Sequence, residues 1–291
     1  ATGLVCAGAI LAPIIPPSIP MIVLGVTVDL SIGRMFMSGI VPGIILGLAL
    51  MAAWWWAVKK DGYEDVRTFT REEVLQTLKN AAPALMMPVI IIGGIRFGIF
   101  TPTEAGAFAA VYAFAISVFL YRELNMTQLT EVCFNAAKMT AIVMFVVSAA
   151  TAVGWLMTLA QIPDQIVALF ADFIDKPFLL LVIINVFLLI LGMVMDLTPN
   201  ILIFGPVLFP LIQKAGIDPY FFALIMILNL CIGLLTPPVG TILYLGCSLG
   251  NISFDRVIKG VFPFLMVEIV ILAVYIVFPS IVMVPLKWLM Q

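Results

Sequence analysis

Long continuous runs of apolar residues constrain this chain more than any other feature of its sequence. Eight such runs lie at 4–26, 39–58, 81–98, 105–121, 139–160, 178–195, 220–235 and 261–284. Most of them approach the ~20 residues that a helix needs to cross the hydrocarbon core of a bilayer. Strands of an outer-membrane barrel would instead alternate apolar and polar residues. The sequence therefore predicts an all-α polytopic membrane protein.

Composition argues against several other function classes. Only 10% of the residues are charged, the net charge is −2, and there is no histidine. A nucleic-acid-binding surface is normally basic, and histidine is the commonest metal ligand and proton shuttle. We therefore expect no nucleic-acid partner. No catalytic set of residues is evident either, so we do not expect an enzyme.

The basic residues between the runs predict how the chain crosses the membrane. If segments 59–80, 122–138 and 251–259 share one side, that side carries nine of the 14 Lys and Arg residues. Basic loops are typically cytoplasmic. This arrangement requires segment 178–213 to enter and leave on the other side, as a re-entrant hairpin. Connectors 59–80 and 122–138 are predicted to be interfacial helices, although solvated loops would also fit.

The chain contains an internal repeat in which each copy carries a diproline. Shifting by 221 residues aligns 16–42 with 237–263, with six identities in 27 positions. The identical pairs are Pro16 and Pro237, Pro17 and Pro238, Leu24 and Leu245, Gly25 and Gly246, Gly39 and Gly260, and Pro42 and Pro263. Proline interrupts helical hydrogen bonding, so both helices should break, and the basic-residue assignment orients them oppositely. Such inverted repeats are typical of secondary transporters, although two simple kinks would also fit.

The repeat divides the chain into segments. Residues 1–58 end the first copy, and residues 139–285 form the second copy with hairpin 178–213, broken helix 220–250 and a last span. The counterpart of the hairpin would precede Ala1, so we expect the complete protein to carry it upstream.

Asp196 is the most conspicuous residue of the predicted hairpin. A carboxylate within an apolar run normally faces a cavity or a partner. We predict Thr198 as the N-cap of the second half-helix and Pro199 as its first residue. The tip would turn one carbonyl end and one amide end toward the same space, where cations and carboxylates can bind. Helix capping alone would also explain Asp196.

Segment 81–121 is predicted to hold two helices around Thr101–Glu104. Thr101 as N-cap and Glu104 three residues later form a predicted capping box, which explains Glu104 structurally. Arg96 ends the preceding helix. Its guanidinium could hold a carboxylate substrate or extend toward the interface, and both readings remain open.

These motifs resemble the large membrane subunit of tripartite ATP-independent periplasmic (TRAP) transporters. The resemblance rests on Ile14–Pro20, Gly93–Gly94 with Phe100–Ala105, Met195–Pro199 and Gly233–Gly240, which occur in the family's order. It covers the whole chain but only about the last two thirds of a usual large subunit. It implies an inverted-repeat, elevator-type fold with broken helices. The implied function is sodium-driven import of an organic acid across the bacterial inner membrane, with a periplasmic binding protein and a small membrane subunit, separate or fused.

The resemblance also implies roles for individual residues. By similarity, one Na⁺ site would comprise Asp196, Thr198, Asn200, Gly233, Thr236 and Pro237, and half of another would include Pro16 and Pro17. Ser18 and Asp196 would face the substrate, with Arg96 as a further candidate. The Gly-Gly-Ile-Arg-Phe-Gly segment favours a sialic-acid member over C4-dicarboxylate or other carboxylate transporters. An ion channel and a non-transporting structural membrane subunit remain alternative readings.

Overall fold

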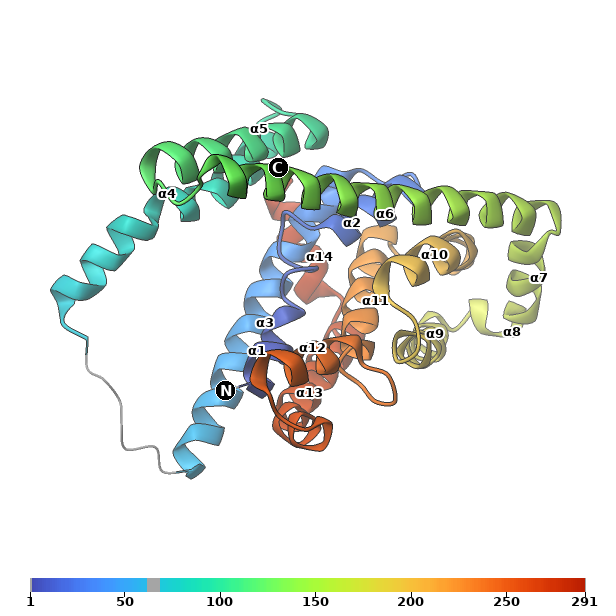
Figure 1. Cartoon of the computed structure of the whole chain (residues 1–291). Helices are drawn as coiled ribbons and strands as arrows, with labels where there is room; N and C mark the ends of the chain where they lie inside the picture. The colour runs from blue at the N-terminus through green and yellow to red at the C-terminus, as the bar shows by residue number, and fades with distance from the viewer. Residues whose placement is uncertain (1, 62–68, 291) are drawn as a thin grey trace. The chain divides into compact units, whose positions relative to one another are not determined.

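The computed structural model describes residues 2–61 and 69–290, and Figure 1 shows the path of the chain. Within those residues the elements are all helices, joined by turns. Six helical segments there are long and apolar enough to cross a membrane, namely 32–59, 71–96, 102–120, 126–159, 197–214 and 254–277. The predicted all-α polytopic membrane fold is confirmed.

The chain forms two compact units. Unit 1 comprises Ala1–Asp61 and Ala149–Gln291, and unit 2 comprises Gly62–Ser148. Unit 1 contains both diprolines, the helices on either side of them and the predicted hairpin. Unit 2 contains the helices on either side of Thr101–Glu104. Each unit is described separately below.

The first copy of the repeat is interrupted between Ala9 and Ile19, and this interruption contains the diproline, as predicted. Helix α1 spans Thr2–Ala9, and a series of turns leads to Pro16 and Pro17, whose peptide bond is cis. Helix α2 then spans Ile19–Thr27, with Ser18 as its N-cap, and helix α3 spans Ile32–Asp61. Proline has no N–H to donate, so it ends a helix but fits the first turn of the next one.

The second copy has the same element order. Helix α11 (Pro219–Gly233) ends before the cis diproline Pro237–Pro238, α12 spans Thr241–Gly250, and α13 spans Phe254–Val277. Adding 221 to the bounds of α2 gives 240–248, against 241–250 for α12. Adding 221 to the first residue of α3 gives 253, against 254 for α13. The repeat is therefore present in the helices as well as in the sequence.

The predicted hairpin consists of α9 (Pro177–Gly192) and α10 (Leu197–Lys214), separated by a short turn. The chain leaves α10 through Gly216, whose φ of +71° is in the left-handed region that suits glycine. The Asp218 carboxylate then accepts hydrogen bonds from the Tyr220 and Phe221 amides and caps α11. By length and composition α10 could also span a membrane, so re-entry stays a prediction.

Helix α11 lies at the centre of unit 1. Every residue from Phe221 to Gly233 is buried, and α11 packs against α9, α10, α13, α2 and α3. The two copies also touch directly, since the Tyr275 hydroxyl on α13 donates to the Pro42 carbonyl on α3 at 2.8 Å. The core of unit 1 is thus built from both copies.

Unit 2 contains α4 (Arg71–Arg96), α5 (Pro102–Ala115), the short π-helix η1 (Ile116–Leu120) and most of α6 (Met126–Leu159). Two tyrosine hydroxyls bond to carbonyls of α4. Tyr112 on α5 donates to the Pro83 carbonyl at 2.9 Å, and Tyr121, directly after η1, donates to the Asn80 carbonyl at 2.6 Å.

Three predicted boundaries differ from the structure. Residues 71–80 and 126–138, parts of the predicted connectors 59–80 and 122–138, form the first turns of α4 and α6. Both helices continue from these polar residues into the apolar runs, and α4 does so through Pro83 and Pro88. Residues 62–68 lie outside the described part. The last span, predicted to reach 284, ends at Val277, since Pro279 disfavours helical geometry at Phe278. Helix α14 (Ser280–Leu289) follows, and the short α7 (Ile162–Leu169) and α8 (Ala171–Ile174) precede α9.

Candidate functional site

The last residues of α9 and α11 meet backbone to backbone. A Cβ atom built on Gly233 would lie 2.6 Å from both the Cα and the carbonyl carbon of Gly192. Only glycine at this position permits such an approach. The final turns of helices leave carbonyl groups without intrahelical donors and carry partial negative charge. The contact therefore brings two negative helix ends together.

The hairpin tip adds oxygen atoms beside this contact. Asp196 is exposed, and its carboxylate accepts a hydrogen bond from the Leu197 amide at 2.9 Å. Asn200 is fully buried, and its Nδ2 donates to the carbonyls of Met195 and Asp196 at 3.1 Å each. Within the described chain the Asn200 Oδ1 atom has no hydrogen-bond donor. The tip thus offers a carboxylate and an unused amide oxygen.

The predicted cap of α10 is wrong by two residues. The N-cap is Asp196 rather than Thr198, and Pro199 is the third helical residue rather than the first. Aspartate caps a helix as well as threonine does. Proline fits here because the first four helical N–H groups have no intrahelical acceptor in any case. Thr198 is half-buried in the first turn.

The break between α11 and α12 begins directly after the Gly192–Gly233 contact. The Thr236 amide donates to the Gly233 carbonyl at 2.9 Å, and its hydroxyl donates to the Ile232 carbonyl at 2.8 Å. Pro237 follows and has no N–H. Because the Thr236 hydroxyl donates its proton to the Ile232 carbonyl, its oxygen lone pairs remain available to accept a hydrogen bond or to bind a cation. The structure places hairpin tip and break against each other through the two glycines, and the metal-binding roles stay predictions.

Ser18 lies at the break of the first copy. It is 2% exposed. Its hydroxyl donates to the Pro13 carbonyl and accepts from the Met21 amide at 3.3 Å. These bonds stabilise the diproline turn and the start of α2, which packs against α10. They account for Ser18 structurally, while its predicted contact with substrate stays a prediction, as do the roles of Pro16 and Pro17.

In unit 2 the predicted capping box is confirmed. The Thr101 amide donates to the Glu104 carboxylate at 2.8 Å, and the Glu104 amide donates to the Thr101 hydroxyl at 3.3 Å. Arg96 is the exposed last residue of α4. A cation there is favourable next to the negative helix end. This supports the structural reading of Arg96 and leaves its role in substrate binding untested.

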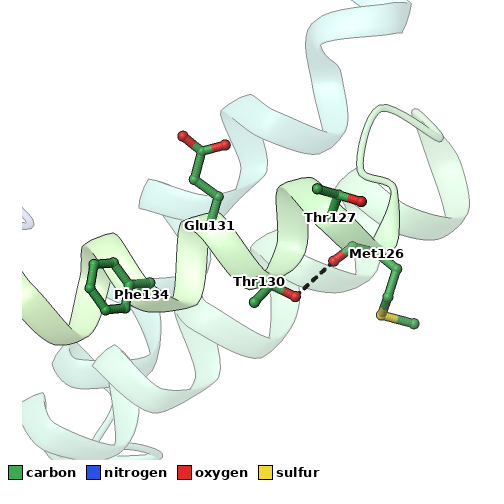
Figure 2. Close-up of a pocket in the computed structure, with 5 residues that line it drawn as sticks. All are labelled: Met126, Thr127, Thr130, Glu131 and Phe134. Carbon is green, nitrogen blue, oxygen red and sulfur yellow. Dashed lines mark hydrogen bonds between the residues drawn. The ribbon is translucent and has the colours of Figure 1, made fainter.

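Figure 2 shows a hollow along the first turns of α6, also in unit 2. It measures about 540 Å³ and is lined by Met126, Thr127, Thr130, Glu131 and Phe134. The Thr130 hydroxyl donates to the Met126 carbonyl at 2.9 Å, and the Glu131 side chain points away from that bond (Figure 2). All five residues are exposed. A hollow on one helix face without buried polar groups does not make a binding site.

Residues 1–281 match the family model described as the tripartite ATP-independent periplasmic transporter, DctM component. The chain belongs to the TRAP large permease family. It is 45% identical over 289 residues to the 2,3-diketo-L-gulonate TRAP transporter large permease protein YiaN of Escherichia coli, covering 99% of this chain and 68% of YiaN.

Two further TRAP permeases are similar to this chain. Identity to the sialic acid TRAP transporter large permease protein SiaM of Vibrio cholerae is 38%, over 96% of this chain and 66% of SiaM. Identity to the C4-dicarboxylate TRAP transporter large permease protein DctM of Pseudomonas aeruginosa is 34%, over 99% of this chain and 67% of DctM. The chain therefore spans about two thirds of each relative.

Two buried asparagines of this TRAP permease are not among the residues predicted for the site. Asn185 on α9 and Asn229 on α11 are buried and hydrogen-bonded to each other. Their signal was available, because asparagine is uncommon in apolar runs. Glu268 on α13 is fully buried, and among the described residues neither carboxyl oxygen has a donor. Gly246–Gly250 matches Gly-x-Ser-x-Gly, but it lies within helix α12 rather than at a strand-to-helix turn.

Proposed function

We propose that this permease imports an organic acid together with Na⁺ across the bacterial inner membrane. The observation that carries the proposal is the meeting of the α9 and α11 carbonyl ends at Gly192 and Gly233. Discontinuous helices in secondary transporters use such carbonyl ends to coordinate Na⁺. Asp196 and the unpartnered Oδ1 of Asn200 supply further oxygens at the hairpin tip.

The donor set fits a monovalent hard cation. In the described part of the chain no three His, Cys, Asp or Glu side chains group into a metal site. Divalent sites such as those for Ca²⁺ usually draw on several carboxylates. Neutral carbonyl and amide oxygens with one carboxylate offer less charge, which suits Na⁺. We assign Asp196, Thr198, Asn200, Gly233, Thr236 and Pro237 to this site, and Pro16 and Pro17 to half of a second site.

The substrate proposed is an organic acid anion of the sugar-acid type. The relatives are named for diketogulonate, sialic acid and C4-dicarboxylate, and identity falls in that order. Sialic acid thus stays one candidate beside diketogulonate. Na⁺ would neutralise Asp196 and the carbonyl ends, so that an anion can bind near Ser18 and Asp196. Arg96 is a further candidate for the carboxylate.

Coupling requires that Na⁺ and the acid favour the same conformation. We propose that the hairpin and the broken helices move together across the bilayer as an elevator. Substrate would arrive from a periplasmic binding protein, and a small membrane subunit, separate or fused, would brace the permease. The tripartite organisation in the family description supports these partners.

The test compares two aspartates that both cap helices of unit 1. Asp196 caps α10, and Asp218 caps α11. Full-length permease with its small subunit and binding protein is reconstituted in proteoliposomes, and uptake of labelled organic acids is followed against sodium concentration. Asp196→Ala should abolish sodium-dependent uptake, while Asp218→Ala should lose only cap stability, about 1 kcal/mol.

Near-normal uptake by Asp196→Ala would refute the assignment of the site. Flux that does not saturate, or that continues without a sodium gradient, would indicate a channel rather than a coupled transporter.

A further inference from the structure

A pair of buried asparagines joins the two helices that end at the proposed cation site. The Asn229 Nδ2 on α11 donates to the Asn185 Oδ1 at 2.7 Å and to the Asn185 carbonyl at 2.9 Å. The Asn185 Nδ2 donates to the Leu181 carbonyl on its own helix at 2.8 Å. Asn185 is 6% exposed and Asn229 is 1% exposed. We call these two residues the asparagine clamp.

The clamp is set back from the helix ends. Asn229 precedes Gly233 by four residues, and Asn185 precedes Gly192 by seven, so the distances along the helices are about 6 and 10 Å. Both glycines follow their asparagines, so α9 and α11 run toward the contact in the same sense. The clamp therefore cannot ligate a cation at the tip, but it can determine how the two carbonyl ends are presented there.

The Gly192–Gly233 contact alone does not fix that presentation. Glycine has no side chain to interlock, so it allows close approach but leaves rotation and sliding free. One residue of slip turns a helix by about 100° and moves it about 1.5 Å. Between α9 and α11, in the described chain, the only hydrogen bonds made by side chains are those of the clamp. The clamp therefore adds a directional polar restraint on register and rotation to the apolar packing of the two helices.

The surroundings strengthen the clamp. Asn185 and Asn229 border a groove of about 240 Å³ whose other lining residues, from α9 and α13, are all apolar. Apolar side chains offer a buried amide no replacement partner, so breaking the pair is unfavourable. The first copy has no equivalent, because position 229 corresponds to Gly8 (229 − 221).

We propose that Asn185 and Asn229 are positioning residues that set the cation affinity of the second-copy site by holding the α9 and α11 carbonyl ends in register. This inference rests on the proposed function. It assigns to the clamp the role that residues behind metal ligands play in other sites, where their mutation typically lowers metal affinity by about 10–100-fold.

The test measures sodium activation of uptake by the full-length transporter for wild type, Asn185→Ala, Asn229→Ala and the double variant. Each single variant should raise the sodium concentration for half-maximal uptake by about tenfold. At saturating sodium, the maximal rate and the half-saturating substrate concentration should stay within about twofold of wild type. The double variant should match the singles, since residues that act as a pair are non-additive.

Leu224→Ala is the matched control for general destabilisation. Leu224 is fully buried on α11, nine residues before Gly233, and its loss leaves a cavity far from the tip. It should lower the melting temperature of the purified protein without changing sodium activation.

The outcomes separate the clamp from the proposed function. If wild-type uptake depends on sodium and the clamp variants have the same half-saturating sodium concentration as the wild type, the clamp inference is overturned. The same holds if clamp variants and Leu224→Ala shift sodium activation alike. A wild type indifferent to sodium overturns the proposed function, and the clamp's role in cation affinity falls with it.

Discussion

Replacing Gly233 by alanine tests the contact at the centre of the candidate site. The added Cβ would lie 2.6 Å from the Cα and carbonyl carbon of Gly192. Carbon atoms normally approach to about 3.5–4.0 Å. Because both neighbours are backbone atoms, no side-chain rotation can relieve the overlap, so α9 and α11 must separate by about 1 Å.

Overpacking of this size costs about 1–3 kcal/mol. If the strain falls mainly on the cation-bound state, each 1.4 kcal/mol raises the half-saturating sodium concentration about tenfold. Gly233→Ala should therefore raise the half-saturating sodium concentration of uptake by about 5- to 140-fold, measured in proteoliposomes, and lower the melting temperature of the purified protein in sodium.

Two other glycines supply a graded comparison. A Cβ on Gly192 would come no closer than 3.1 Å to its neighbours, and a Cβ on Gly8 would meet nothing within 4 Å. Gly192→Ala should thus change sodium activation and melting temperature less than Gly233→Ala does. Gly8→Ala should leave sodium activation unchanged and add about 0.5–1 kcal/mol of helix stability. The reasoning is refuted if the Gly233→Ala variant has the same sodium activation and the same melting temperature as the wild type.

Two further predictions concern stability. Thr101→Ala removes the side-chain half of the capping box at α5 and should cost about 1 kcal/mol, whereas Thr101→Ser should keep it; equal melting temperatures for the two variants would contradict the box. Glu268→Leu removes a buried carboxyl whose oxygens have no donor among the described residues and should raise stability by about 1–3 kcal/mol. A lower melting temperature for Glu268→Leu would show that the carboxyl has a stabilising partner.

Backbone signals in the sequence predicted the main features of unit 1. In the second copy α11 ends at Gly233, four residues before Pro237, because a proline lacks the N–H and clashes with the carbonyl four residues earlier. In the first copy α1 already ends at Ala9, four residues before Pro13, and the diproline lies in the turns that follow. The offset of 221 residues carried from sequence to helices for the same reason.

In unit 2, Thr101 and Glu104 form the predicted capping box because both residues belong to one helical turn.

Other local signals were ambiguous. Asp196 and Thr198 are both good caps, and Pro199 fits anywhere in a first turn, so sequence alone could not choose the start of α10. The polarity of 71–80 and 126–138 suggested separate helices, but polarity changes solvation and does not interrupt backbone hydrogen bonds. α4 and α6 therefore begin within those segments.

The contacts that define the candidate site had no local signal. Gly192 and Gly233 are 41 residues apart, and Asn185 and Asn229 are 44 apart. Each residue alone is compatible with many neighbours. Only the packing of α9 on α11 brings them together, and that packing depends on the whole of unit 1.

The correspondence between Gly8 and Asn229 has an evolutionary consequence. If the two copies descend from one duplicated ancestor, divergence has kept the prolines and glycines that shape the backbone while changing the side chains behind them. Mutations in one half could then tune one ion site without altering the other. Under the proposed function, a transporter built this way could adjust the affinities of its two proposed Na⁺ sites separately while keeping a single pathway.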